Sequence, residues 1–214
     1  MSLKLIFKLI LVIGALLLVK SCFFPTRAHR KLKITAEVVT PQGLRMGSSV
    51  IDFVYTDVPR WLPGSIGVSR QVIGEATVVD LGNGRFLLVL LHDQYWSHDV
   101  SALLDDRRRE ADGTVKATWM PMLVTFKDAT DATSIVEVAP DNLAAVFGAG
   151  YALRRVVAEP TTDQPTFGTL NQIPAVRDGI LTGTLERRIA KNPSLYVKTA
   201  LQLTSSAFQQ SAPK

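Results

Sequence analysis

Residues 80–91, DLGNGRFLLVLL, decide the fold class of this chain of 214 residues. Asn83-Gly84 is a dipeptide typical of a type I′ turn, because both of its residues readily adopt positive φ. The run that follows, residues 86–91, is apolar at every position, which predicts a strand buried on both faces. The stretch therefore predicts an antiparallel β-hairpin whose second strand is central in a sheet.

The segments on both sides continue the β pattern. Residues 31–39, KLKITAEVV, alternate, with Leu32, Ile34, Ala36 and Val38 on one face, as in a half-buried strand. Further strands are predicted over residues 48–55, 70–81, 122–127, 134–138 and 151–159. Short helices are predicted over residues 99–111, 142–147 and 194–203. The expected fold class is α+β, mainly β: an N-terminal transmembrane helix followed by one antiparallel-sheet-rich domain with two or three short helices.

The N-terminus has a different character, because residues 9–19 form an unbroken apolar run of eleven. A bilayer core of about 30 Å needs about 20 helical residues. Residues 2–24 supply that length if Lys4, Lys8 and Lys20 extend toward the headgroups. We expect a retained membrane anchor formed by Leu5, Leu9, Ile10, Val12, Leu16, Leu17, Leu18 and Val19.

Two alternatives for the N-terminus stay open. A cleaved signal peptide fits the short apolar run, but no small-x-small cleavage site follows it. A lipoprotein attachment at Cys22 fits the only cysteine, but Lys20 stands two residues before it, where a small or apolar residue is expected. The predicted organisation is an anchor over 1–24, a basic neck over 25–30, a soluble β-rich domain over 31–204 and a flexible tail over 205–214.

Charge is distributed unevenly along the chain. Residues 1–33 hold seven of the 24 Lys and Arg residues and no acid. From residue 34 onward, 17 basic residues stand against all 19 acidic residues, a net charge of −2. A body of this charge argues against nucleic acid as a partner, whereas the basic neck suits anionic lipid headgroups.

One segment holds residues that could ligate a metal. Residues 90–100, LLHDQYWSHDV, contain two His-Asp pairs, His92 with Asp93 and His98 with Asp99. Imidazole nitrogen and carboxylate oxygen are suitable ligands for Zn²⁺ or a similar ion. The alternative interpretation is a polar cap between the end of a strand and the start of a helix.

Three stretches taken together resemble a known group of proteins. They are HRKLKITAEVVTPQGLRMGSSVIDFVY over residues 29–55, IGEATVVD over 73–80, and PMLVTFKD over 121–128 with the VAPDNLAA that follows at 138–145. Their order and spacing resemble uncharacterised proteobacterial membrane-anchored proteins, which have a single span and a soluble β-rich domain. The resemblance implies a bacterial membrane location and carries no activity.

Composition offers little for catalysis, since the chain has three histidines and one cysteine. We therefore expect a membrane-anchored, non-enzymatic envelope protein with a binding or scaffolding role, a single-pass topology and a periplasmic body. Its expected partners are membrane lipid and an envelope protein, with no cofactor. One alternative is a metal-assisted hydrolase that uses His92, Asp93, His98 and Asp99. Another is a small-molecule or lipid carrier, which needs an apolar cavity behind residues 32–39 and 86–91.

Overall fold

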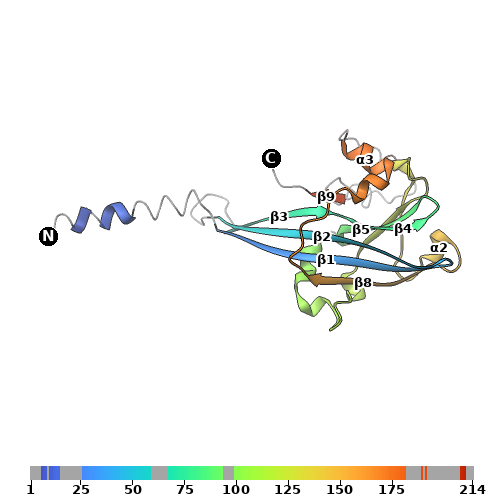
Figure 1. The fold of residues 1–214 in the computed structure, drawn as a ribbon, viewed down its shortest axis with the longest axis horizontal. Coiled ribbons are helices and arrows are strands. Elements are labelled where there is room, and N and C mark those ends of the chain that lie inside the picture. The colour runs from blue at the N-terminus through green and yellow to red at the C-terminus, as the bar shows by residue number, and fades with distance from the viewer. Residues whose placement is uncertain are drawn as a thin grey trace. The chain divides into compact units, whose positions relative to one another are not determined.

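The computed structural model describes residues 6–8, 10–14, 26–58, 67–93, 99–181, 189, 191 and 208–210 (Figure 1). The chain divides into two compact units. The first combines Met1–His29 with Phe53–Gln71, and the second combines Arg30–Asp52 with Val72–Lys214.

The structure is mainly β, with two antiparallel sheets and a few short helices, as the sequence predicts. The five-stranded sheet has the order β8-β1-β2-β3-β9, and the four-stranded sheet has the order β4-β5-β6-β7. The strands of the first are β1 (Arg27–Thr40), β2 (Gly43–Asp57), β3 (Val68–Glu75), β8 (Ala152–Pro160) and β9 (Gln209–Gln210). Those of the second are β4 (Thr77–Gly82), β5 (Arg85–Asp93), β6 (Pro121–Phe126) and β7 (Ile135–Glu137).

Where the described residues give both ends of a helical element, that element is short. The α-helices with described bounds are α2 (Ala144–Phe147) and α3 (Pro174–Leu181). The 3₁₀ turns are η1 (Val100–Leu104), η2 (Asp106–Arg108), η3 (Ala117–Trp119), η4 (Ala132–Ser134) and η5 (Thr169–Gln172).

The predicted hairpin is confirmed. Asn83 and Gly84 have φ values of 55° and 69°, as a type I′ turn requires. β4 and β5 pair in antiparallel register, with Val79 opposite Leu87. β5 lies between β4 and β6, and its residues 87–91 are at most 1% exposed. The unbroken apolar run therefore identified a strand that is covered on both faces.

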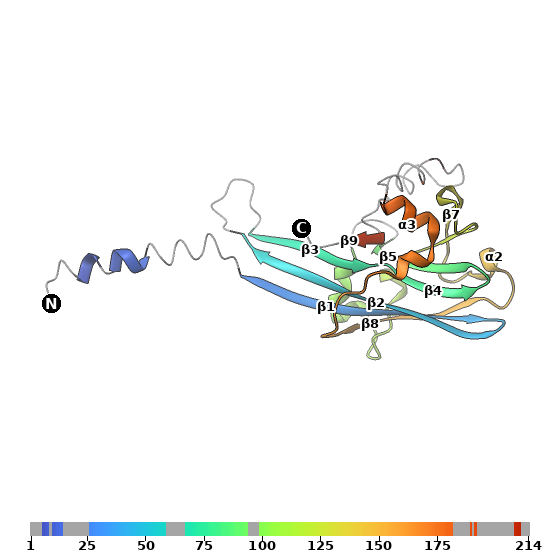
Figure 2. The same ribbon diagram turned by 45° about the horizontal axis from the view of Figure 1, so that its top comes forward.

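Each face of the four-stranded sheet is buried. On one face, Val78, Leu90 and Phe126 pack in a cluster with Leu170, Val176 and other residues of η5 and α3. Figure 2 shows α3 beside this sheet. In the five-stranded sheet, the alternating residues of β1 (Leu32, Ile34, Ala36 and Val38) are at most 1% exposed, which confirms the predicted inward face.

The two sheets meet where the chain passes from β3 to β4. The hydroxyl of Thr77 donates to the carbonyl of Ile34 at 3.4 Å and shares a 2.6 Å hydrogen bond with the hydroxyl of Ser49. Nearby, a Cβ on Gly47 would lie 1.9 Å from the carbonyl oxygen of Val78, so only glycine fits there.

Two elements that the sequence predicts as continuous are each divided in two in the structure. The strand predicted over residues 70–81 is interrupted at Ala76, because β3 and β4 belong to different sheets. The helix predicted over residues 99–111 is two 3₁₀ turns instead. The carboxylates of Asp99 and Asp105 each accept a hydrogen bond from a backbone N–H two residues later, which favours short turns over a continuous helix.

Most of the predicted anchor lies outside the described residues. Residues 6–8 and 10–14 are helical, and Ile10 and Val12 are exposed. Within the described part of the chain, no helix is both long and apolar enough to cross a membrane. The helix predicted over 194–203 also lies outside this part.

The range predicted as a flexible tail contains three described residues. Phe208 is fully buried, and Gln209 and Gln210 pair with Glu75 and Gly74 of β3. These residues therefore belong to the folded domain.

Candidate functional site

The structure brings two of the four predicted metal ligands together along the backbone. His92, near the end of β5, forms an isolated antiparallel bridge with Asp99. One carboxylate oxygen of Asp99 accepts a hydrogen bond from the N–H of Ser101 at 2.9 Å and caps η1. This arrangement agrees with the polar-cap interpretation.

The remaining two candidates cannot be placed in a site. His98 and the side chain of Asp93 lie outside the described part of the structure. Among the described residues, no group of three or more His, Cys, Asp or Glu side chains is arranged to hold a metal ion. The four-residue metal site therefore stays a prediction.

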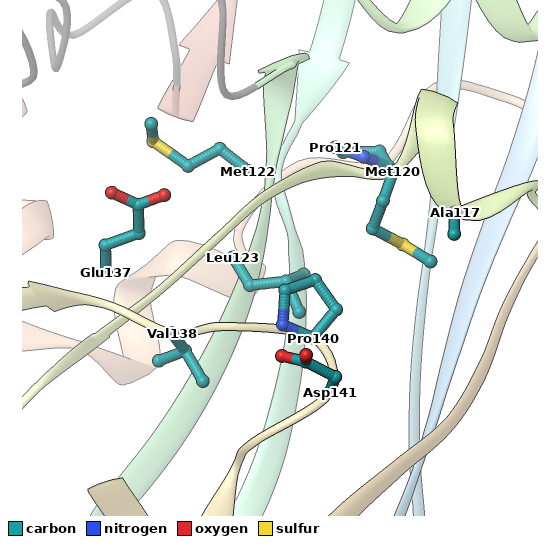
Figure 3. Close-up of a pocket in the computed structure, with 9 residues that line it drawn as sticks. All are labelled: Ala117, Met120, Pro121, Met122, Leu123, Glu137, Val138, Pro140 and Asp141. Carbon is teal, nitrogen blue, oxygen red and sulfur yellow. The ribbon is translucent and has the colours of Figure 1, made fainter. Parts of the chain in front are cut away.

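A pocket of about 270 Å³ lies at the start of β6 and the end of β7 (Figure 3). We call it the β6–β7 pocket. It is lined by Ala117, Met120, Pro121, Met122, Leu123, Glu137, Val138, Pro140 and Asp141. Its volume lies just below the range of about 300–1,000 Å³ that is common for small-molecule sites. The pocket therefore suits a small ligand or a single side chain.

The local sequence explains the shape of this pocket. The N–H of Met120 donates to the carbonyl of Ala117 at 3.3 Å, so η3 turns the chain just before β6. Pro121 starts β6, a strand position where proline is tolerated. The N–H of Val138 donates to the carbonyl of Leu123 at 2.9 Å and extends the β6–β7 pairing by one residue. Pro140 then follows β7 and forms part of the wall.

The described residues that line the pocket are mostly apolar, and the charged ones among them, Glu137 and Asp141, are acidic. Met122, Leu123 and Val138 are at most 3% exposed, whereas Glu137 and Asp141 are exposed. Among the described residues, no Lys, Arg or His lines the pocket, and none forms a hydrogen bond or an ion pair with either carboxylate. Partial burial raises the pKa of Glu137 above its ordinary value. A nearby cation would offset the cost of this desolvation by stabilising the charged carboxylate.

In contrast to the pocket carboxylates, Glu75 and Glu37 are buried and bind other parts of the fold. Glu75 is 3% exposed, and its carboxylate accepts hydrogen bonds from the N–H groups of Gly168, Thr169 and Leu170 at 2.7, 2.9 and 3.3 Å. The hydroxyl of Thr169 adds a fourth at 2.8 Å. The carboxylate thus caps η5 from a distant strand, which is a structural role.

Glu37 is the second such group. It lies opposite Arg155 across β1 and β8 and accepts a 2.9 Å hydrogen bond from the guanidinium. Arg154 approaches the same carboxylate at 3.5 Å. The hydrogen bond from Arg155 is the main reason that the pKa of Glu37 lies below its ordinary value.

Sequence reasoning missed the pocket. Its two main segments, Met120-Pro121-Met122 and residues 137–141, are 15 positions apart, and neither carries a known chemical motif. The one sequence signal for the pocket was that two acids, Glu137 and Asp141, flank Pro140 at the end of a short predicted strand. Nothing in the sequence indicated that this turn faces the start of β6.

We compared the chain with protein-family models, with curated protein sequences and with solved structures. None of the three comparisons found a match.

Proposed function

We propose that the chain is a membrane-anchored, non-enzymatic binding protein of the bacterial envelope, and that the β6–β7 pocket is its binding site. The anchor is the apolar segment within residues 1–24. The ligand is a cationic group on an apolar stem, such as a lysine side chain that a partner envelope protein presents.

One observation carries the binding proposal: Glu137 and Asp141 stand beside apolar walls, with no cation from the described residues to neutralise them. Methionine walls adapt to a flexible aliphatic stem, and lysine buries such a stem while its ammonium reaches a polar partner. An ammonium would also stabilise the charged form of Glu137, whose pKa burial raises.

The test measures binding of two small probes to the full-length chain in detergent. N-acetyl-lysine methylamide carries the cation, and N-acetyl-norleucine methylamide has a similar stem without it. We expect chemical-shift changes at Met122 and Val138 with the lysine probe. Replacing both Glu137→Gln and Asp141→Asn should weaken its binding by about fivefold, since exposed ion pairs contribute up to about 1 kcal/mol.

The matched control is Asp163→Asn, an exposed carboxylate outside the pocket. It should leave the affinity unchanged. Equal binding of both probes, or equal loss in the control, would contradict recognition of a cation at this site.

The membrane part of the proposal has a separate test. The full chain should remain in the membrane pellet after alkaline carbonate extraction, and Cys22→Ser should remain there too. Release of wild type would contradict the anchor. Release of only the Cys22→Ser variant would identify a lipoprotein instead of a span.

A metal-assisted hydrolase is a second candidate, favoured by the backbone bridge between His92 and Asp99. Metal analysis of the purified chain tests it. One equivalent of zinc, lost on His92→Ala, would support this candidate against the first.

A further inference from the structure

The ends of three strands meet in the first unit, immediately after the predicted anchor. The N–H of Asp57, at the end of β2, donates to the carbonyl of Thr26 at 3.1 Å. The N–H of Val58 donates to the carbonyl of Gly67 at 3.0 Å, just before β3. We call residues 26–29, 57–58 and 67–70 the neck platform.

Chain length limits how far the neck platform can lie from a membrane. The predicted anchor ends at residue 24, and one residue separates it from Thr26. A chain spans at most about 3.6 Å per residue, so Thr26 lies within about 7 Å of the end of the anchor. The hydrogen bonds from Asp57 and Val58 then hold the ends of β2 and β3 beside Thr26.

The surface of the neck platform is exposed and mainly basic. Thr26–His29, Asp57 and Val68–Arg70 are exposed. Arg27 and Arg70 carry positive charge, Asp57 is its only acid, and Arg30 follows directly in the chain. The chain from residue 34 onward has instead a net charge of −2. Each basic side chain near an anionic membrane surface raises the affinity of a protein for that surface by about fivefold.

We propose that the neck platform lies on anionic lipid headgroups, so that Arg27 and Arg70 hold the strand ends against the bilayer. This inference rests on the proposed anchor, which brings the platform to the membrane. The occupant is the lipid surface, because the platform continues the anchored chain and has the complementary charge.

The experiment uses the full chain with Cys22→Ser, which removes the only native cysteine. Ser69→Cys places a thiol on the platform, and Ser48→Cys places one at an exposed position of β2 outside it. The labelling rate with an uncharged polyethylene glycol maleimide is measured in phosphatidylcholine nanodiscs with and without phosphatidylglycerol. We expect phosphatidylglycerol to slow labelling at position 69 at least fivefold and to leave position 48 unchanged.

Charge removal provides the decisive variant. Arg27→Gln with Arg70→Gln should restore fast labelling at position 69, and circular dichroism should confirm that the variant is folded. Equal rates in the two lipid compositions would overturn the docking. If the chain fails to co-purify with nanodiscs, the proposed anchor is wrong. If it co-purifies but phosphatidylglycerol does not slow labelling of Ser69→Cys, only the docking of the neck platform is refuted.

Discussion

Glu75 at the end of β3 and Glu137 at the end of β7 are the same side chain in two different settings. The Glu75 carboxylate accepts four hydrogen bonds from residues 168–170 and is almost fully buried. Glu137 is exposed beside apolar walls and has no hydrogen-bonding or ion-pair partner among the described residues. Both lie where a strand of a sheet ends.

Burial and bound donors distinguish a structural carboxylate from a candidate binding group in this chain. A buried charge is retained only when donors satisfy it, so replacing Glu75 should cost folding free energy. An exposed carboxylate without a partner adds little to stability, so replacing Glu137 should change binding while the fold persists. Variants at Phe208, Glu75, Gly47, Glu37 and Glu137 test this contrast.

The largest effect is expected from Phe208→Ala, beside Glu75. The carbonyl of Phe208 accepts a hydrogen bond from the N–H of Ala76 at 2.8 Å, and its ring packs 6.5 Å from the ring of Phe126. Removing a fully buried phenyl group costs about 3–5 kcal/mol. Urea unfolding should show this loss, whereas Phe167→Ala, at a side chain that is 49% exposed, should cost less than about 1 kcal/mol. Similar losses for both would contradict the packing role of Phe208.

Glu75→Gln should come next, with a loss of about 2–3 kcal/mol. The amide keeps the size of the side chain but presents one NH₂ group toward backbone N–H donors, which then lack an acceptor. Chemical denaturation measures the loss. Glu137→Gln is the control and should stay within about 0.5 kcal/mol of wild type. A Glu75→Gln variant as stable as wild type would show that this carboxylate is not needed to hold η5.

Gly47→Ala tests the close approach of β2 to β4, next to the Thr77 contact. A Cβ there would lie 1.9 Å from the carbonyl oxygen of Val78, so the backbone must shift. Overpacking of this kind costs about 1–3 kcal/mol. The thermal midpoint should fall by several degrees, and Ser48→Ala at the neighbouring exposed position should leave it nearly unchanged. An unchanged midpoint in both variants would mean that the strands can separate freely.

Glu37→Gln should destabilise by about 1 kcal/mol near neutral pH, because its partners Arg155 and Arg154 are partly solvated. The pKa of Glu37 is lowered from 4.5, chiefly by the Arg155 hydrogen bond. Its stabilising contribution is therefore present above pH 4.5 and disappears as the pH falls through the lowered pKa. Urea midpoints of the variant and wild type should differ at pH 7 and converge in acid. A gap that persists in acid would point to a packing effect.

Replacing Glu137 should have the smallest effect on stability, and its pH dependence should have the opposite sign to that of Glu37. Burial raises its pKa, so its contribution is most favourable below its ordinary pKa and is lost as the pH rises through the raised value. Glu137→Gln should therefore be as stable as wild type, or slightly more stable, at pH 7. Binding of the lysine probe to wild type should weaken as the pH falls through this raised pKa. A pH-independent affinity would remove Glu137 from the binding site.

Local patterns in the sequence determined much of the sheet structure. Asn83-Gly84 specified its turn because few residues tolerate positive φ, and the alternation of residues 32–38 specified which face of β1 is buried. Gly148 also ends α2 near the expected place. Each of these depends on neighbouring residues in the chain.

Tertiary structure decided the rest. The break at Ala76 separates two strands that the sequence pattern predicts as one, because the chain passes from one sheet to the other there. The Ala76 N–H donates instead to the carbonyl of Phe208. The roles of Glu75 and Glu137 also could not be read from sequence, since their surroundings come from segments that lie far away along the chain. Backbone preference acts over a few residues, whereas burial and hydrogen bonding of a carboxylate depend on which distant segments the fold brings beside it.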